Sequence, residues 1–343
     1  MDCGGTKLNL TLALRLLRLY LFTCLPFGCT SYSTQIINPE ISDAATDPDA
    51  SEDPDAQPSR CTGMGAQPLN SSWALVSKGR SRTARVHVPV SYDPTIPTPL
   101  VLNFHGYTQD PFQQALITGM LKKSDDESFI AVHPLGLGVI NSWNGGDCCG
   151  EAAVQNVDDI GFVRDLIDEL SQRLCIDRTR VFATGFSNGG FLAHRLACEA
   201  SDVIAAIAPV AGVLGVSNCA PGRPMPVMHF HGTADIVVPY NGSTLLGFSS
   251  VEQTIDHWAF RNNCSQDSTV TFHNGDTTCE TRSGCDDNGP VTQCTIALGG
   301  HTWPGGLPLP TGKTTYDISA TDAMWDFFLE HPHPTRGHQL VTR

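Results

Sequence analysis

The chain has 343 residues, of which 41% are hydrophobic, and this is enough apolar material for one large domain with appendages. Its formal charge is −14 and is unevenly spread: residues 40–60 hold seven acids and one arginine, residues 1–39 carry a net +2, and residues 61–343 therefore carry −10. A folded region with this acidic excess does not track a phosphate backbone, so composition argues against nucleic acid as a partner.

The amino end has the pattern of an export signal. Three basic residues accompany an apolar core at 19–27, which is too short and too interrupted for a typical membrane span. We expect residues 1–29 to be this signal and the protein to be secreted or held at the cell surface. Two interpretations stay open: residues 25–29 loosely match a bacterial lipoprotein cleavage site, which would anchor the protein to a membrane through lipidated Cys29, or a simple secretory signal is cut nearby.

Residues 30–60 are predicted to form a disordered tether. From residue 38 onward the segment is acidic, punctuated by proline and free of aromatic residues. Such a segment cannot bury enough apolar surface to offset its ordering entropy. One folded domain is expected over residues 61–330, followed by a polar tail over 331–343.

Cysteine usage supports export. Cys3, Cys24 and Cys29 belong to the signal region, and ten cysteines remain: Cys61, Cys148, Cys149, Cys175, Cys198, Cys219, Cys264, Cys279, Cys285 and Cys294. An even number in an exported chain indicates disulfides, whose pairing the spacing does not reveal. We expect at least two bridges within residues 264–294. One or two free thiols are the alternative, and zinc is a weak one because no C-x-x-C spacing occurs.

Beyond residue 80 the hydrophobic pattern alternates between strands and helices. Strands are predicted at 86–90, 100–104, 129–133, 180–184, 203–210, 227–230 and 292–297, and helices at 113–123, 160–174, 191–197, 251–262 and 320–330. This alternation predicts an α/β fold whose mostly parallel, twisted sheet has helices on both faces. No internal repeat and no large lid is expected.

A serine stands between one of these strands and the helix that follows it. Ser187 lies in the pattern G-x-S-x-G, after the strand at 180–184 and before the helix at 191–197. In this context the serine is held on a strained turn with its oxygen exposed at a helix amino end. Gly185 and Gly189 are needed because a Cβ at either position would crowd strand against helix. The alternative is a glycine-rich turn with an incidental serine.

Two later strand ends supply partners for this serine. Asp235 ends a polar turn after the strand at 227–230, and His301 lies in a glycine-rich turn after the strand at 292–297. Open α/β sheets assemble their sites at the carboxyl ends of strands. The order serine, acid, histidine is that of an α/β-hydrolase triad, so we predict Ser187, Asp235 and His301 as nucleophile, acid and base.

An oxyanion hole is predicted from two backbone amides. The strand at 100–104 ends in His105-Gly106, a turn that provides one donor in such enzymes, and the residue after the nucleophile provides the other. These donors are the N–H groups of Tyr107 and Asn188. His105 itself is expected to be a structural hydrogen-bonder. The alternative is that His105-Gly106 is simply a turn.

Five segments together resemble the secreted polyhydroxybutyrate depolymerase and feruloyl esterase family of α/β-hydrolases. They are Trp143–Gly150, Val157–Phe162, Gly185–Gly190, His231–Asp235 and Gly300–Gly305. The similarity runs in order through nearly all of the folded part, and the His-Thr-Trp-Pro-Gly block is more specific than the serine motif. The resemblance implies a serine carboxylesterase with no metal and no organic cofactor.

The resemblance also bears on the substrate, a small or polymeric ester. Aliphatic polyester depolymerases often differ from the Ser-Asn-Gly-Gly form seen here, which favours aromatic or short-chain esters over a polymer. Trp143 and Trp303 are expected either to form aromatic walls beside the acyl group or to be packing residues.

Three other functions are weighed against this one. A polyester depolymerase usually has an added substrate-binding module, and none is expected after Glu330. A serine peptidase would need a means to hold a peptide, for which the sequence offers no sign. A non-catalytic surface binding protein would not need the triad. The oligomeric state is not predicted.

Overall fold

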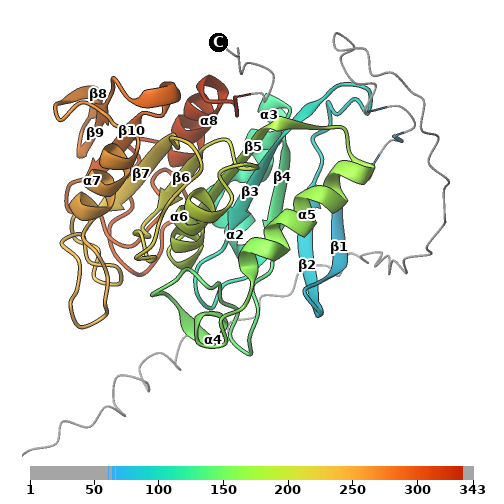
Figure 1. The fold of residues 1–343 in the computed structure, drawn as a ribbon, viewed down its shortest axis with the longest axis horizontal. Coiled ribbons are helices and arrows are strands. Elements are labelled where there is room, and N and C mark those ends of the chain that lie inside the picture. The colour runs from blue at the N-terminus through green and yellow to red at the C-terminus, as the bar shows by residue number, and fades with distance from the viewer. Residues whose placement is uncertain (1–60, 62–63, 66, 335–343) are drawn as a thin grey trace, which may run out of the picture. The chain divides into compact units, whose positions relative to one another are not determined.

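The computed structural model describes residues 61, 64–65 and 67–334, and a ten-stranded sheet runs through this part of the chain (Figure 1). The predicted signal with Cys29, the tether at 30–60 and residues 335–343 of the tail lie outside the described residues. The strands are β1 (Asn70–Ser77), β2 (Arg80–His87), β3 (Thr98–Phe104), β4 (Ile130–Pro134), β5 (Ile176–Phe186), β6 (Ile207–Val210), β7 (Val227–Gly232), β8 (Ser268–Asn274), β9 (Thr277–Arg282) and β10 (Val291–Ile296).

The sheet is parallel through its centre and antiparallel at both edges. Its order is β1-β2-β4-β3-β5-β6-β7-β10-β9-β8. Neighbours from β4 across to β10 are parallel, whereas β1, β2, β9 and β8 pair antiparallel. The carboxyl ends of β3, β5, β7 and β10 consequently lie along one edge of the sheet. The predicted mostly parallel sheet is confirmed.

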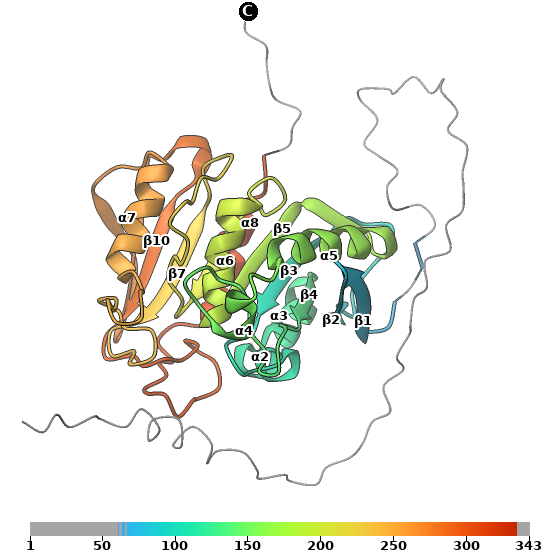
Figure 2. The same ribbon diagram turned by 60° about the horizontal axis from the view of Figure 1, so that its bottom comes forward.

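Helices cover both faces of this sheet, as the alternation predicts (Figures 1 and 2). They are α2 (Pro111–Thr118), α3 (Met120–Glu127), α4 (Gly150–Val154), α5 (Asp159–Arg173), α6 (Asn188–Glu199), α7 (Val251–Arg261) and α8 (Ala320–Glu330), with a 3₁₀ turn at Asp286–Asn288. One core layer includes Leu166 of α5 and Leu192 of α6, and the other includes Met324 and Phe328 of α8. The long connections 233–250 and 297–319 carry no helix, so neither forms a helical lid.

The amphipathic helix α5 shows how local sequence determines one of these elements. Its first turn is capped by Asp158, whose carboxylate accepts the N–H of Gly161 at 2.7 Å. Its buried apolar residues recur at three- and four-residue steps, so one stripe of the helix packs on the sheet: Ile160, Val163, Leu166, Ile167 and Leu170. Cap and stripe together explain why the sequence predicts this helix nearly to its ends.

Several predicted boundaries were wrong. The helix predicted at 113–123 is two helices, because Gly119 adopts φ 63 and ends α2 before α3 begins. The strand predicted at 203–210 starts only at Ile207, since the preceding apolar residues form a buried turn after α6. Of the strand predicted at 86–90, only residues 86–87 are strand, as the end of the longer β2, and residues 88–90 lie beyond it. Strands β1, β8 and β9 were not predicted. Every residue of β8 is exposed, so buried and exposed positions do not alternate along it.

Disulfides pair all ten cysteines of the described residues. The prediction of at least two bridges within 264–294 is confirmed by Cys264–Cys285 and Cys279–Cys294. The others are Cys61–Cys175, Cys148–Cys149 and Cys198–Cys219. Cys279–Cys294 joins β9 to β10, the strand that leads to His301.

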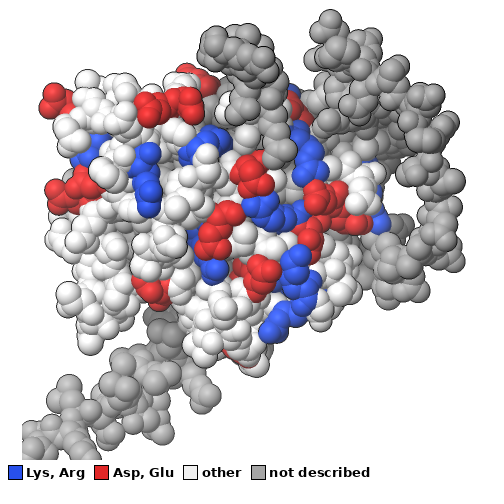
Figure 3. Space-filling view, viewed as in Figure 1, with Lys and Arg blue, Asp and Glu red and all other residues white. Residues whose placement is uncertain are grey.

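The surface is mixed in charge on the face shown in Figure 3, where basic side chains lie among acidic ones. The exposed ion pairs of the described residues include Arg178–Asp168. Within the described residues, no helix is both long enough and apolar enough to cross a membrane.

Candidate active site

Ser187 occupies the turn between β5 and α6. Its backbone has φ 55 and ψ −118, and non-glycine residues rarely adopt positive φ. A Cβ on Gly185 would lie 2.5 Å from the carbonyl group of Gly189, and one on Gly189 would lie 2.1 Å from the Phe104 oxygen. Both glycines are therefore required by close packing, as predicted, and the serine stands at the amino end of α6.

Asp235 and His301 meet at the ends of two neighbouring parallel strands, β7 and β10. His301 Nδ1 lies 2.6 Å from Asp235 Oδ2, and the carboxylate accepts its proton. The other carboxylate oxygen accepts the N–H groups of Val237 and Val238, each at 2.8 Å. These bonds orient the imidazole as the Nδ1–H tautomer and leave Nε2 as its basic atom.

The charge of Asp235 is sustained by its partners. Burial would raise the pKa of this carboxyl, but hydrogen bonds from His231 and His301 outweigh burial and hold the pKa well below its usual range. Asp235 is consequently ionised at neutral pH and stabilises a positive charge on His301.

The imidazole of His301 lies next to the serine turn. Its ring centroid is 4.7 Å from that of Phe186, the residue before Ser187. The backbone N–H of His301 donates to Thr311 O at 3.2 Å, which fixes the histidine loop. No hydrogen bond joins Ser187 Oγ to His301 Nε2 within the described residues. In substrate-free enzymes this bond is often long and tightens when substrate binds.

The two predicted oxyanion donors come from the turns that follow the neighbouring strands β3 and β5. Tyr107 lies in the turn after β3, and its N–H makes no backbone hydrogen bond within the described residues, unlike that of its neighbour Thr108. Asn188 is the first residue of α6, where backbone N–H groups lack intrahelical acceptors. Both amides are therefore available to a developing oxyanion.

The side chain of Asn188 has a role that the sequence did not predict. Its Oδ1 accepts the Trp143 N–H at 2.7 Å and its Nδ2 donates to Trp143 O at 2.9 Å. The amide thus pairs with the backbone of residue 143 and ties that loop to α6. No sequence signal could have found this contact, because the partner lies 45 residues away.

Trp143 and Trp303, weighed as aromatic walls or as packing residues, are both fully buried. The Trp143 indole donates to His105 O at 3.0 Å, and its ring packs edge-on against Phe104. The Trp303 indole donates to Thr321 Oγ1 at 3.0 Å. Neither side chain presents a surface to an acyl group here, so the wall interpretation is corrected: both tryptophans pack behind the site.

His105 is a structural hydrogen-bonder in this structure, as expected. Its Nδ1 lies 2.7 Å from the Gly106 carbonyl oxygen, and its Nε2 accepts the Gly136 N–H at 2.9 Å. Because a carbonyl only accepts and an N–H only donates, the ring is the neutral Nδ1–H tautomer. Burial lowers the pKa of His105 to about 4.

The stability of the protein is expected to fall between pH 6.5 and pH 4, in part because of His105. An unfolded histidine binds a proton below about pH 6.5, whereas folded His105 does so only near about pH 4. The unfolded state therefore binds more protons in this window, and the free energy of unfolding drops by about 1.4 kcal/mol per pH unit for this group. Urea titrations at several pH values should show a shallower slope for His105→Gln than for wild type.

The control for this measurement is His273→Gln, at an exposed position of β8. It should keep the wild-type dependence on pH. Equal slopes for His105→Gln and wild type would contradict the assignment of a buried neutral imidazole.

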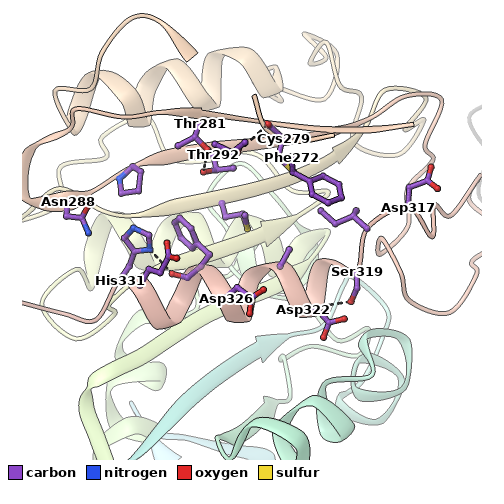
Figure 4. Close-up of a pocket in the computed structure, with 17 residues that line it drawn as sticks. Phe272, Cys279, Thr281, Asn288, Thr292, Asp317, Ser319, Asp322, Asp326 and His331 are labelled. Atoms are coloured by element: carbon purple, nitrogen blue, oxygen red, sulfur yellow. Dashed lines mark hydrogen bonds between the residues drawn. The ribbon is translucent and has the colours of Figure 1, made fainter. Parts of the chain in front are cut away.

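A groove of about 690 Å³ lies elsewhere, between α8 and the β8–β9–β10 edge (Figure 4). Asp322 and Asp326 line it from α8, and Phe272 lines it from β8. None of the predicted catalytic residues contributes to its wall. We therefore locate the candidate active site at the strand ends that carry Ser187, Asp235 and His301, and this groove is not part of it.

Comparison with known proteins shows that the chain is similar to esterases. The profile of the phospholipase/carboxylesterase family matches residues 151–262. Feruloyl esterase B from Piromyces equi is 30% identical over 238 residues, which are 64% of this chain and 42% of that protein. A bifunctional acetylxylan esterase/xylanase from Neocallimastix patriciarum is 29% identical over 257 residues, 73% of this chain and 33% of that protein. This chain thus spans less than half the length of either relative.

Other relatives match along most of their length. Feruloyl esterase C from Emericella nidulans is 28% identical over 278 residues, 78% of this chain and 90% of that protein. Acetyl xylan esterase from Aspergillus awamori superposes with a TM-score of 0.55 at 13% identity, covering 75% of this chain and 98% of that chain. At such low identity the superposition shows the fold alone. The chain therefore has the α/β-hydrolase fold and is similar in sequence to feruloyl and acetylxylan esterases.

Proposed function

We propose that the chain is an exported serine carboxylesterase, with Ser187 as nucleophile, His301 as base and Asp235 as the acid that orients the base. The observation that carries the proposal is the 2.6 Å hydrogen bond between His301 Nδ1 and Asp235 Oδ2, made beside a serine on a strained strand–helix turn. This constellation is recognised by its geometry and chain order. The esterase names of the relatives support the same reaction class.

The mechanism follows from these positions. His301 Nε2 takes the hydroxyl proton as Ser187 Oγ attacks the ester carbonyl, and Asp235 stabilises the resulting imidazolium. The N–H groups of Tyr107 and Asn188 receive the oxyanion, a contribution of about 2.7–4 kcal/mol per donor. The C–O bond to the alcohol then breaks, and His301 returns the proton to the leaving oxygen. Water, deprotonated by His301, cleaves the acyl-enzyme and releases the acid.

Exposed apolar side chains near the acid and base favour an apolar or aromatic acyl group. Ile236 and Val237 directly follow Asp235 and are 81% and 41% exposed, and Leu298 is 73% exposed. Thr233 Oγ1 accepts the Leu298 N–H at 2.8 Å, so the two loops lie together. Exposed apolar side chains gathered near a site commonly bind ligands. Together with the feruloyl esterase relatives, this makes an aromatic ester the first candidate substrate and a short-chain acyl ester the second.

Export is part of the proposal. Five disulfides in the described residues fit an oxidising compartment. Residues 1–29 would direct export, and residues 61–330 would form the catalytic domain that hydrolyses the ester. Residues 30–60 would link the amino end to this domain. Intact mass and detergent partitioning of the mature protein distinguish a lipid on Cys29 from a plain secretory cut, and a mature terminus beyond Cys29 would exclude the anchor.

Four substrates test the proposed function: a para-nitrophenyl ester, methyl ferulate, a peptide amide and a polyester film. We expect turnover of both soluble esters, with the higher kcat/KM on methyl ferulate if the acyl site is aromatic. Release of soluble acids from the film with slow ferulate turnover would instead assign a polyester depolymerase. Cleavage of the amide alone would assign a peptidase, and no turnover of any substrate would contradict a catalytic function.

A further inference from the structure

Three buried histidines form a row that ends beside Asp235. His229 and His231 alternate along β7 and so share one face of the strand, while His194 comes from α6. All three are fully or almost fully buried. The proposed mechanism uses none of them, although His231 stands in the same block as the acid.

These side chains form a continuous line of hydrogen bonds, which we call the imidazole relay (His194, His229 and His231). Trp258 Nε1 of α7 donates to His194 Nδ1 at 3.0 Å. His194 Nε2 lies 3.3 Å from His229 Nδ1, and His229 Nε2 lies 3.1 Å from His231 Nδ1. The line therefore crosses from α7 through α6 to β7.

Both ends of the relay determine the direction of its hydrogen bonds. An indole N–H can only donate, so His194 Nδ1 accepts from Trp258 and its Nε2 carries the proton. His194 Nε2–H then donates to His229 Nδ1, which leaves the proton of His229 on its Nε2. In the same way, His229 Nε2–H donates to His231 Nδ1, and the proton of His231 is on its Nε2. At the other end, His231 Nε2 lies 2.8 Å from Val238 O, and a carbonyl can only accept. Donor and acceptor ends agree, and all three rings are Nε2–H tautomers.

The end of the relay reaches the catalytic carboxylate in two ways. His231 Nε2 is 3.4 Å from Asp235 Oδ2, the oxygen that also accepts from His301. Val238 is held through both of its backbone polar groups, because its oxygen accepts from His231 while its N–H donates to Asp235 Oδ1 at 2.8 Å. The position of His231 thereby determines the geometry of the turn that carries the acid.

The environment keeps the first two rings uncharged. Burial lowers the pKa of His194 to about 3 and that of His229 well below its ordinary value. The other titratable groups facing the relay are His257 on α7, Asp235, and Tyr240, whose ring meets His231 edge-on. Uncharged rings at His194 and His229 therefore add no positive charge to the surroundings of Asp235.

We propose that His231 is a positioning residue for the hydrolytic reaction: held as the Nε2–H tautomer by His229, it clamps Val238 and so fixes the Asp235 carboxylate toward His301. The inference rests on the proposed function, since its consequence is the orientation of the base. With the opposite tautomer, His231 would present a lone pair to two oxygens, and the turn would lose its clamp. A carboxylate displaced by a fraction of an ångström then aligns the base poorly.

The first test reads the tautomers in the wild-type protein. Nitrogen-15 NMR of labelled histidines, assigned by the loss of one resonance in each His→Gln variant, reports the proton on each ring. We expect Nε2–H for all three relay rings at neutral pH, with His194 and His229 unchanged down to about pH 5. Trp258→Phe should release the preference at His194, whereas Trp325→Phe, at a buried indole bound to Glu127, should not. An Nδ1–H form at any of the three rings would overturn the proposal.

The second test separates positioning from packing. His231→Leu should lower kcat about 10- to 100-fold with KM nearly unchanged, and His231→Gln, which keeps a donor toward Val238, should recover most of this loss. The matched control is His331→Leu, which removes a buried imidazole bound to Phe327 O at the end of α8. A similar loss of kcat in the control, or none in His231→Leu, would contradict the positioning role.

The two proposals can fail separately. The Nδ1 proton shared by His301 and Asp235 gives a far-downfield proton resonance that needs no substrate, and His231→Leu should move it upfield. If wild type hydrolyses no ester, the proposed function fails while this resonance still reports on the relay. If esters are hydrolysed and the resonance does not move in His231→Leu, only the positioning role fails.

Discussion

Ser187→Ala is expected to lower kcat/KM on a soluble ester by at least about 10⁴-fold, because alanine lacks the hydroxyl that the proposed acyl-enzyme requires. The fold should persist, since alanine removes one oxygen and keeps the Cβ that the strained turn already accommodates. Steady-state kinetics give the first quantity, and thermal unfolding should place the midpoint within about 2–4 °C of wild type.

Ser171→Ala is the matched control for this experiment. Ser171 lies on α5, where its hydroxyl donates to Ile167 O of the same helix at 2.7 Å. This variant should retain full activity. Activity within tenfold of wild type in Ser187→Ala would overturn the assignment of the nucleophile.

The second large effect concerns a buried ion pair. Arg82 Nη2 lies 2.7 Å from Asp159 Oδ1, and the exposed fractions of the two side chains are 2% and 0%. Burial raises the pKa of Asp159 and lowers that of Arg82, so each charge depends on the other. Asp159→Ala should therefore lower the free energy of unfolding by about 3–5 kcal/mol, because it leaves a guanidinium buried without its counter-ion. Urea denaturation at neutral pH measures the loss.

Asp159 also accepts the Asn144 N–H at 2.8 Å, so its removal frees the loop behind the site as well. Two further variants show whether the loss of stability in Asp159→Ala comes from the unpaired buried charge. Asp168→Ala breaks the exposed pair with Arg178 and should cost at most about 1 kcal/mol. The double variant Arg82→Met/Asp159→Leu removes both charges and should recover part of the stability. A loss in Asp159→Ala no larger than that in Asp168→Ala would show that the buried pair is not required.

The features that could be predicted from the sequence are those that a local pattern of residues determines. Helix α8 has the bounds predicted for it, 320–330, because its apolar stripe and its Ser319 cap are local features. The glycines around Ser187 were also understood correctly, since their role follows from the turn itself. Asp235 and His301 were placed at strand ends by the same alternation that predicts the parallel sheet.

The remaining features depend on contacts between distant segments. The imidazole relay needs α6 beside β7, and only the alternation of His229 and His231 on one face is visible in the sequence. The burial of Trp143 follows from its packing under the His105 carbonyl, which a motif does not encode. Strand β8 is exposed at every position, and its only apolar residues are Val270 and Phe272, an alternation too short to mark a strand. The pairing of the cysteines likewise could not be predicted, because it depends on which segments the fold brings together.

The adjacency of β7 and β10 has a consequence for how the proposed esterase should lose activity on heating. The acid and the base follow strands that are paired from Val227↔Val291 to Gly232↔Ile296, whereas Ser187 follows β5, from which β7 is separated by β6. Shearing of the sheet across β6 would carry the carboxylate and the imidazole together and leave the hydroxyl behind. Thermal inactivation should accordingly begin with misalignment between nucleophile and base, while the couple that transfers the proton is still intact.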